Sequence, residues 1–276
     1  MQTLPMPRPQ RPTAPRLTAL ALLASLWLAG CATVAPAPEP DSPPPPPTVA
    51  GGEATAEMPP GLHWARNSAE IQALYLQIYQ EAGEALVDLA ADRTPFTWAV
   101  VIDADETLID NSQYQKERAL QGLGFTYDSW HEWVRREEAT ALPGAREFLE
   151  AVRGLGGKVA VVTNRSEAVC GPTESNLRKL RLAFDIVLCK PLEGPSGKAL
   201  RWQAVEKGTA SRSLPPLEIV MWVGDNIEDF PGGSQALAAG PEGTDPDMRR
   251  TLTRFGYDFF ILPNPMYGSW EDNPRQ

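Results

Sequence analysis

The chain has 276 residues and a formal net charge of −10, which arises from 35 acidic and 25 basic side chains. This length leaves room for one sizeable domain. So acidic a composition argues against a nucleic acid polymer or an anionic membrane surface as a direct binding partner, and an anionic small molecule would need a local group of cations.

The first 30 residues have the layout of an export signal. They contain three arginines, no acidic residue, and an apolar stretch from Leu17 to Leu28 that is short for a membrane-spanning helix. The sequence Leu-Ala-Gly-Cys at 28–31 resembles the end of a bacterial lipoprotein signal, in which the cysteine is acylated and becomes the new N-terminus. We therefore expect residues 1–30 to be removed and Cys31 to carry the lipid. The alternative is an uncleaved anchor or an ordinary signal peptide in which this cysteine is incidental.

A lipid on Cys31 would hold the exported protein in the bacterial cell envelope. Ala32 rather than Asp follows the cysteine, which in enteric bacteria would not signal retention at the inner membrane, so we expect the outer membrane. Residues 31–60 are rich in Pro, Ala and Glu and favour an extended tether that cannot form a core. The same segment could instead bind a domain that recognises proline-rich peptides. Without the signal, 22 basic and 35 acidic residues remain, a net charge of −13.

Strand and helix patterns alternate along residues 61–276, which is typical of an α/β domain with a parallel sheet. Apolar spacing predicts a helix over 67–91, with Asn67 or Ser68 as its N-cap, and an apolar run predicts a buried strand over 98–102. Residues from about 110 to 142 are not obviously sheet and are interpreted as an inserted cap segment with a helix around 128–138. The other predicted elements are helices over 143–152 and 172–182, and strands over 158–162, 184–188, 218–223 and 259–262.

Acidic residues follow two of the predicted strands. Asp103 and Asp105 come directly after the first strand, where the binding crevice of an open α/β sheet lies. Two carboxylates so close disfavour joint ionisation, and a hard divalent cation such as Mg²⁺ would relieve that conflict. A strand end that caps a turn is the alternative. However, the strand over 218–223 also ends in acids, Asp225 and Asp229, so we expect a metal site between the two strand ends.

The order of these motifs resembles one family. Asp-x-Asp-x-Thr follows the first strand, Thr163-Asn164-Arg165 the second, a lysine lies in a later loop, and Gly224-Asp225-x-x-x-Asp229 follows the fourth strand. This series resembles the haloacid-dehalogenase-like phosphohydrolases, and within them the bacterial lipoprotein acid phosphatases (class C nonspecific acid phosphatases, including lipoprotein 5′-nucleotidases). The resemblance implies a Rossmann-like haloacid-dehalogenase fold: a mostly parallel central sheet flanked by helices, with a small inserted cap. Further matching stretches are 64–70, Trp130-x-x-Trp133 before Pro143-Gly144, 262–264 and 267–270.

The resemblance also implies catalytic roles for Asp103 and Asp105, and metal-binding roles for these two and for Asp225 and Asp229. Asp103 would attack phosphorus and form an aspartyl-phosphate. Asp105 would protonate the leaving oxygen and then activate the water that clears the intermediate. Mg²⁺ would bind the carboxylates of Asp103 and Asp225 and the main-chain carbonyl of Asp105, while Asp229 would order a metal-bound water.

Phosphate oxygens would be bound, by the same resemblance, at the end of the second strand and by a lysine. Thr163 and Asn164 are the expected groups there, although a hydroxyl at a strand end can simply make a turn. Lys198 is favoured over Lys190, because it precedes Arg201-Trp202 with the spacing of the family pattern. A solvated surface lysine is the alternative for either.

Aromatic residues and two cysteines complete the expectations. Trp130 or Trp133 with Tyr267 would form a clamp for a nucleoside base or another flat leaving group, as in the family. Packing of the insert against the core is the alternative, above all for Trp133. Cys170 and Cys189 are a disulfide candidate in an oxidising compartment, or else two buried free thiols.

The sequence therefore favours a lipid-anchored, Mg²⁺-dependent acid phosphatase that hydrolyses small phosphate monoesters, nucleoside monophosphates among them. A phosphatase-like surface lipoprotein with a binding role and a phosphotransferase on the same fold are the alternatives. The physiological substrate, the native metal, the side of the membrane and the oligomeric state stay open.

Overall fold

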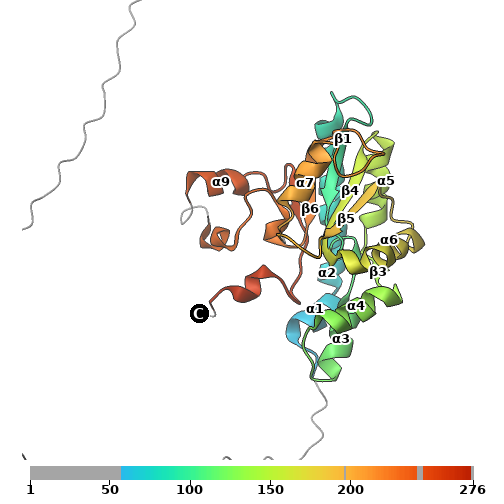
Figure 1. Ribbon diagram of the computed structural model, residues 1–276. Coiled ribbons are helices and arrows are strands. Elements are labelled where there is room, and N and C mark those ends of the chain that lie inside the picture. The colour runs from blue at the N-terminus through green and yellow to red at the C-terminus, as the bar shows by residue number, and fades with distance from the viewer. Residues whose placement is uncertain (1–56, 196, 241–244, 275–276) are drawn as a thin grey trace, which may run out of the picture. The chain divides into compact units, whose positions relative to one another are not determined.

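The centre of the fold is a sheet of five parallel strands in the order β5-β4-β1-β6-β7 (Figure 1). Because the strands are parallel, their carboxyl ends lie at one edge of the sheet, as the expected α/β fold requires. The bounds are β1 Trp98–Ile102, β4 Lys158–Ser166, β5 Ile186–Lys190, β6 Glu218–Gly224 and β7 Phe259–Ile261. The predicted parallel sheet is confirmed.

The computed structural model describes residues 57–195, 197–240 and 245–274. The predicted signal over 1–30, the lipid on Cys31 and most of the tether over 31–60 lie outside the described residues. Among the residues that are described, no helix is both long and apolar enough to cross a membrane.

Side chains of β1 alternate between two cores, one on each face of the sheet. Trp98, Val100 and Ile102 join a cluster that includes residues of α2 (Ala69–Ala90), α5 (Ala145–Gly154) and α6 (Cys170–Lys179). Ala99 and Val101 point to the opposite face, into a cluster with residues of α7 (Ala199–Glu206). Since successive strand residues face opposite sides, a continuous apolar run is what a strand buried on both faces needs.

The first predicted helix is two helices in the structure. α1 spans Pro60–Asn67 and α2 spans Ala69–Ala90, with Ser68 between them. The Ser68 hydroxyl accepts a hydrogen bond from the Ile71 amide at 3.2 Å, so the N-cap prediction is confirmed. The sequence analysis missed α1, because its eight residues contribute only two buried side chains, Leu62 and Ala65.

The third predicted strand is displaced along the chain. It begins at Ile186 rather than 184, because the Asp185 carboxylate accepts hydrogen bonds from the Val159 amide at 2.9 Å and from the Lys158 ammonium at 3.0 Å. Asp185 thus closes the turn into the strand. β4 also continues four residues past the predicted end at 162, to Ser166.

The segment interpreted as an insert holds two helices rather than a loop and one helix. α3 (Ser112–Leu120) and α4 (Tyr127–Arg136) lie beside α1 at one end of the fold (Figure 1), between the short antiparallel strands β2 (Ile109–Asp110) and β3 (Thr140–Ala141). α3 was missed because its sequence is mostly polar and buries only Ser112 and Tyr114. The remaining elements are η1 Glu167–Val169, η2 Ile227–Asp229, η3 Gln235–Ala239, α9 Pro246–Leu252 and η4 Ser269–Asp272.

Cys170 and Cys189 form a disulfide, with their Cα atoms 5.9 Å apart. Of the two readings that the sequence left open, the bridge is the one in the structure. It ties the first residue of α6 to β5, and so connects two elements at the edge of the sheet where the site lies.

Candidate active site

Three carboxylates meet where β1 and β6 end. Asp103 follows β1, Asp225 follows β6, and Asp229 ends η2 one turn later; one oxygen from each lies within 4.8 Å of the others. Asp103 and Asp229 are only 7% and 6% exposed. The two acidic motifs, over a hundred residues apart in sequence, thus form one cluster, at the base of a cavity of about 550 Å³.

Local backbone structure explains how Asp229 reaches the cluster. The Asp229 carboxylate accepts the backbone amide of Asn226 at 3.1 Å, while the Asn226 side chain accepts the backbone amide of Glu228 at 3.0 Å, so the two residues form a capping box at the start of η2. A Cβ at position 224 would lie 2.5 Å from the Cβ of Asp229. Glycine is therefore required at 224 for this side chain to fold back over the strand end.

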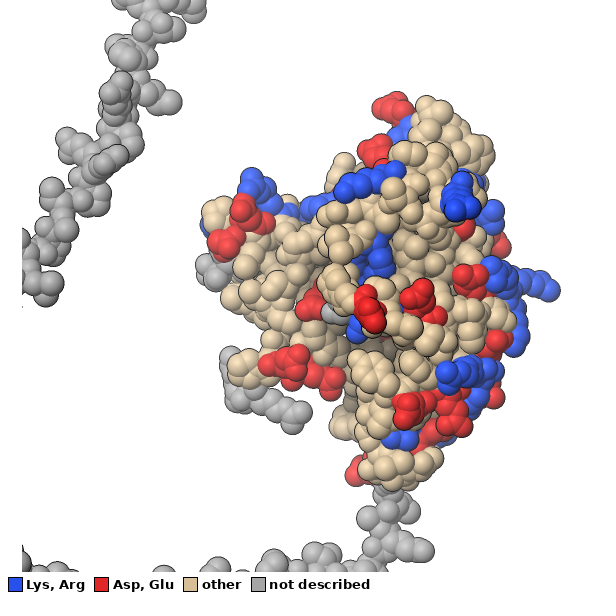
Figure 2. Space-filling model, in the orientation of Figure 1, with Lys and Arg blue, Asp and Glu red and all other residues tan. Residues whose placement is uncertain are grey.

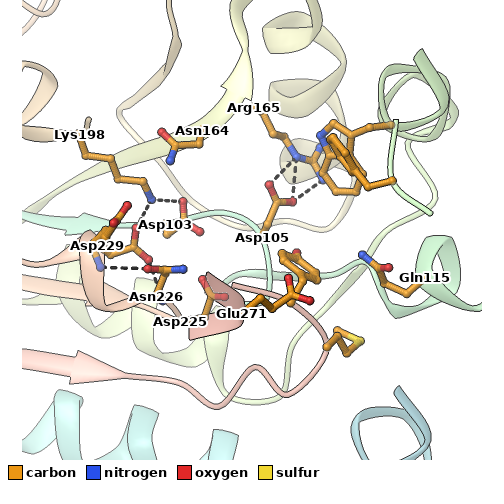
Figure 3. Close-up of a pocket in the computed structure, with 15 residues that line it drawn as sticks. Asp103, Asp105, Gln115, Asn164, Arg165, Lys198, Asp225, Asn226, Asp229 and Glu271 are labelled. Atoms are coloured by element: carbon orange, nitrogen blue, oxygen red, sulfur yellow. Dashed lines mark hydrogen bonds and ion pairs between the residues drawn. The ribbon is translucent and has the colours of Figure 1, made fainter. Parts of the chain in front are cut away.

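Lys198 supplies the cation inside the cluster. Its ammonium contacts a carboxylate oxygen of Asp103 and lies 2.5 Å from one of Asp229, and its side chain is only 5% exposed (Figure 3). Burial lowers the pKa of Lys198, but the two carboxylates outweigh burial and raise the pKa above its ordinary value. Lys198 is therefore a permanent positive charge. Lys190, at the end of β5, does not line the cavity.

Negative charge remains in excess after Lys198 is counted. Burial first, and then the charges of Asp229 and Asp105, raise the pKa of Asp103 to about 7 despite the lysine. Burial first, and then the charges of Asp229 and Asp103, hold the pKa of Asp225 well above its ordinary value. Three carboxylates with one lysine leave two surplus negative charges, and closely spaced oxygens are the ligands of a hard divalent cation. The donor set therefore fits a divalent metal held by Asp103, Asp225 and Asp229.

Asp105 lies apart from this cluster. Figure 3 shows its carboxylate directed toward Arg165. Arg165 donates from Nε to Oδ1 of Asp105 at 2.9 Å and contacts this oxygen through Nη2 at 2.7 Å. The side-chain amide of Asn111 also donates to it, at 2.8 Å. The carboxylate of Asp105 is thus absent from the metal-binding group, and the expected metal contact there was its main-chain carbonyl only.

The residues predicted to bind phosphate divide in the same way. Asn164 lines the cavity, and its side-chain oxygen accepts a hydrogen bond from Arg201 at 2.7 Å. Thr163 is fully buried; its hydroxyl accepts the amide of Arg165 at 3.1 Å, and its carbonyl accepts a hydrogen bond from Arg201. Thr163 is not among the cavity-lining residues. The hydroxyl makes a local contact within β4, where the pairing with β5 is irregular, and its contact with phosphate stays a prediction.

The aromatic residues that line the cavity include one that was not expected. Trp130 and Tyr267 line the cavity, as expected, and Phe125 joins them. Trp133 is 2% exposed and donates its indole N–H to the Asn111 side chain at 2.9 Å, so it packs the cap onto the core. The aromatic-rich stretch over 125–133 contained the signal for Phe125, but the sequence does not say which ring faces the cavity.

Three further buried residues had no assigned role in the sequence analysis. Arg165 was noted only as part of the Thr163-Asn164-Arg165 motif and Asn111 was given no role, yet both contact Asp105. Glu106 is 1% exposed, its carboxylate accepts the amide of Asn111 at 2.8 Å, and burial holds its pKa well above the ordinary value. A buried arginine needs a charged or hydrogen-bonded partner, so an arginine just beyond the predicted strand over 158–162 was the available signal.

Comparison with known proteins places the chain in a family. Residues 48–270 match the family described as HAD superfamily, subfamily IIIB (acid phosphatase). The class C acid phosphatase from Bacillus anthracis has a TM-score of 0.65 at 30% identity, over 76% of this chain and 85% of that chain. Its tungstate-bound structure gives a TM-score of 0.66 at 29% identity, with the same coverage. The stem 28 kDa glycoprotein of Glycine max is 27% identical over 171 residues, so the chain spans 58% of that relative's length.

The family match covers the strand-end aspartates, Lys198 and the cap together. It also agrees with the parallel sheet and its flanking helices, so the predicted haloacid-dehalogenase-like fold is confirmed. The protein belongs to the acid phosphatases of HAD superfamily subfamily IIIB.

Proposed function

We propose that the protein is a phosphoric monoester hydrolase that acts through an aspartyl-phosphate on Asp103. The observation that carries this proposal is that Asp103 and Asp105 lie in different surroundings within one cavity. One carboxylate lies among Lys198 and two further acids, and the other lies apart, anchored by Arg165, in the same cavity. Two acids in different surroundings suit a nucleophile and a proton-transfer group.

The first half of the reaction begins at Asp103. One of its carboxylate oxygens attacks phosphorus, and the bond between phosphorus and the leaving oxygen breaks. Asp105 gives its proton to that leaving oxygen as the bond breaks. Lys198 contacts Asp103 and would lie close to the transferred phosphoryl group, where its charge stabilises the developing negative charge.

The second half of the reaction restores both aspartates. The carboxylate of Asp105 takes a proton from a water molecule, which attacks phosphorus and displaces Asp103. A divalent cation, when bound, would neutralise the surplus charge of the cluster and polarise the phosphoryl oxygens. We propose that this cation is Mg²⁺, held by the carboxylates of Asp103 and Asp225, by the main-chain carbonyl of Asp105 and, through water, by Asp229.

Nucleoside monophosphates are the substrate class that we propose. Support comes from Phe125, Trp130 and Tyr267, which line the cavity that also contains the carboxylates. Aromatic faces stack on any flat ring, so such a wall favours a base without reading its identity. The Bacillus anthracis relative binds tungstate, a tetrahedral oxyanion shaped like phosphate, which agrees with an oxyanion site in this family.

We also propose that the protein is exported and lipid-anchored through Cys31, on the outer membrane. The signal layout over 1–31 and the proline-rich segment that follows support this proposal. The disulfide between Cys170 and Cys189 adds support, because disulfides persist in oxidising compartments. Figure 2 shows acidic and basic side chains intermingled over the face in view, and we propose no nucleic acid partner.

The function is tested by phosphate release from p-nitrophenyl phosphate and from nucleoside monophosphates, with Mg²⁺ or with a chelator. The wild-type protein is compared with Asp103→Asn and with Asp92→Asn, an exposed aspartate outside the cavity. Metal-dependent turnover that Asp103→Asn abolishes and Asp92→Asn retains is the expected result. Absence of turnover with metal present would favour a binding role, and transfer to an added alcohol in preference to water would identify a phosphotransferase.

A further inference from the structure

Arg165 is the most deeply buried charged group that touches the catalytic aspartates. It lies in β4, between Val162 and Ser166, where the pairing with β5 is irregular, and it lines the cavity with a side chain that is 1% exposed. Four groups surround its guanidinium: the carboxylate of Asp105, the amide oxygen of Asn111, the hydroxyl of Thr173 at 3.3 Å, and the Trp130 ring at 5.3 Å. A charge held on so many sides has little freedom to move.

The contacts of Arg165 with Asp105 are unequal for the two carboxylate oxygens. Oδ1 lies 2.9 Å from Nε and 2.7 Å from Nη2, and it also accepts the Asn111 amide at 2.8 Å. Oδ2 has a 3.2 Å contact with Nε. One oxygen is therefore fixed by three short contacts, while the other has, among the described residues, only the longer one. The side chain that carries both oxygens is 17% exposed and lines the cavity.

Asn111 connects this corner to the cap. Its side-chain oxygen accepts hydrogen bonds from Arg165 Nη2 and from the Trp133 indole, both at 2.9 Å. Its own amide donates to Asp105, so the same residue contacts the arginine and its carboxylate partner. Trp133, which is not among the residues that line the cavity, thus supports Asp105 through Asn111. We call Arg165, Asn111 and Trp133 the Asp105 frame.

Neutralisation of a buried carboxylate would not by itself require this frame. An ammonium would supply the charge, whereas the planar guanidinium with an amide beside it also fixes the rotation of the carboxylate. Proton transfer in a transition state depends on that orientation, because the acid has to lie within hydrogen-bond reach of the leaving oxygen.

We propose that Arg165 is a positioning residue that holds Asp105 by Oδ1 and leaves Oδ2 as the oxygen that transfers the proton; this rests on the proposed phosphatase function. When the bond between phosphorus and the leaving oxygen breaks, its electron pair stays on that oxygen, which receives the proton from Oδ2. Oδ2 later takes a proton from the attacking water. Asn111 and Trp133 keep the guanidinium in place during both steps.

Leaving-group dependence separates this role from a structural one. p-Nitrophenolate departs without a proton, whereas the alkoxide of a nucleoside 5′-phosphate needs one. We expect Arg165→Met to lower kcat/KM for the nucleoside monophosphate by about 100-fold and for p-nitrophenyl phosphate by about 5-fold or less, since general acid catalysis contributes at least about 100-fold. Arg165→Lys keeps the charge but loses the paired contacts, and is expected to lie between Arg165→Met and wild type.

Double substitution supplies a second readout. Residues that act as a unit are strongly non-additive, so Arg165→Met combined with Asp105→Asn is expected to be no slower than Asp105→Asn alone. The overturning result is an equal loss for both substrates, together with losses that multiply in the double variant. Arg146→Met is the matched control, because this half-buried arginine donates to the Leu180 carbonyl at 2.8 Å and does not line the cavity; its effect is expected to be equal for both substrates.

Folding is checked by thermal unfolding and near-UV circular dichroism. If Arg165→Met does not fold, Trp133→Phe carries the test, because it removes the indole donor to Asn111 while it keeps an aromatic ring in the core. The same leaving-group dependence, with a smaller loss, is expected, and a uniform loss would overturn the proposal. An inactive wild-type protein would instead refute the phosphatase function. If the wild type is active and Asp105→Asn shows the leaving-group effect, but the variants of Arg165 and Trp133 do not, the role of Arg165 alone is refuted.

Discussion

Asp103 and Asp105 are two residues apart in the chain and lie in opposite surroundings. Asp103 faces Lys198 and two other carboxylates, where burial and like charges raise its pKa to about 7. Asp105 faces a guanidinium and an amide that fix one of its oxygens. The comparison shows how a short loop after a strand produces two chemically distinct carboxylates. Asp103 meets the acids that follow β6 and the lysine that precedes α7, whereas Asp105 meets an arginine of β4.

The largest expected effect separates the two aspartates directly. Asp103→Asn removes the nucleophile and is expected to lower kcat at least about 10⁴-fold for every substrate. Asp105→Asn is expected to cost about 10²- to 10⁴-fold in kcat/KM for nucleoside monophosphates and less for p-nitrophenyl phosphate. Steady-state kinetics on both substrates gives the comparison. Equal leaving-group profiles for the two variants would mean that the aspartates do not have separate roles.

Lys198→Met tests the Asp103 side. Loss of the ammonium leaves Asp103 and Asp229 without their cation, and removal of one transition-state charge contact costs about 10²- to 10³-fold in kcat. Removing one partner from a buried ion pair also destabilises the fold, by about 3 kcal/mol. Chemical denaturation measures the stability, and Lys190→Met, at the end of β5 and outside the cavity, is the control that is expected to retain activity.

The pH dependence of thermal stability, measured with and without Mg²⁺, tests the carboxylate cluster around Asp103. The pKa of Asp103 in the folded protein is raised to about 7. In the metal-free protein this residue therefore adds to the free energy of unfolding below the ordinary pKa of an aspartate, and the contribution is lost as the pH rises through about 7. The raised pKa of Asp225 acts in the same direction. We expect the metal-free protein to lose thermal stability between about pH 5 and pH 8, and Mg²⁺ to stabilise it more at the higher pH, where protons no longer compete. A Mg²⁺ effect that is equal at both pH values would contradict the assigned metal site.

Removal of the disulfide tests the surroundings of Asp105 and has the smallest expected effect on activity. Cys170 begins α6, which also carries Thr173, a hydrogen-bond partner of Arg165. Replacing both cysteines by serine opens a loop with a sequence separation of 19 residues and is expected to lower the free energy of unfolding by about 3 kcal/mol. Activity below the unfolding transition is expected to fall only slightly, and by more for nucleoside monophosphates than for p-nitrophenyl phosphate.

Much of the framework followed from local patterns in the sequence. The apolar runs over 98–102 and 218–223 predicted the two strands that carry the aspartates, because strands buried on both faces are continuously apolar. Lys198 was preferred over Lys190 from its spacing before Arg201-Trp202, and the structure brings Lys198 to the cluster. The two strand predictions succeeded because each depends on a few neighbouring residues, whereas the preference for Lys198 came from the family resemblance and its contact with phosphate stays a prediction.

What could not be predicted depends on contacts between distant segments. The sequence left open whether Trp133 lines the cavity or packs on the core, and the outcome depends on its indole contact with Asn111, a partner that no local pattern identifies. The role of Arg165 depends on its contact with Asp105, sixty positions away in the sequence. Helix α3 escaped detection because a polar helix held by its neighbours has no strong apolar period.

The most direct measurement of the division between the aspartates is mass spectrometry of the trapped covalent intermediate. Asp105→Asn is mixed with p-nitrophenyl phosphate, quenched in acid, digested and analysed for added phosphoryl groups. Because this substrate needs no proton for its first step while the second step lacks its base, one phosphoryl group is expected to accumulate on Asp103. Phosphate on another residue, or p-nitrophenol release without any phosphorylated Asp103, would contradict the assigned roles.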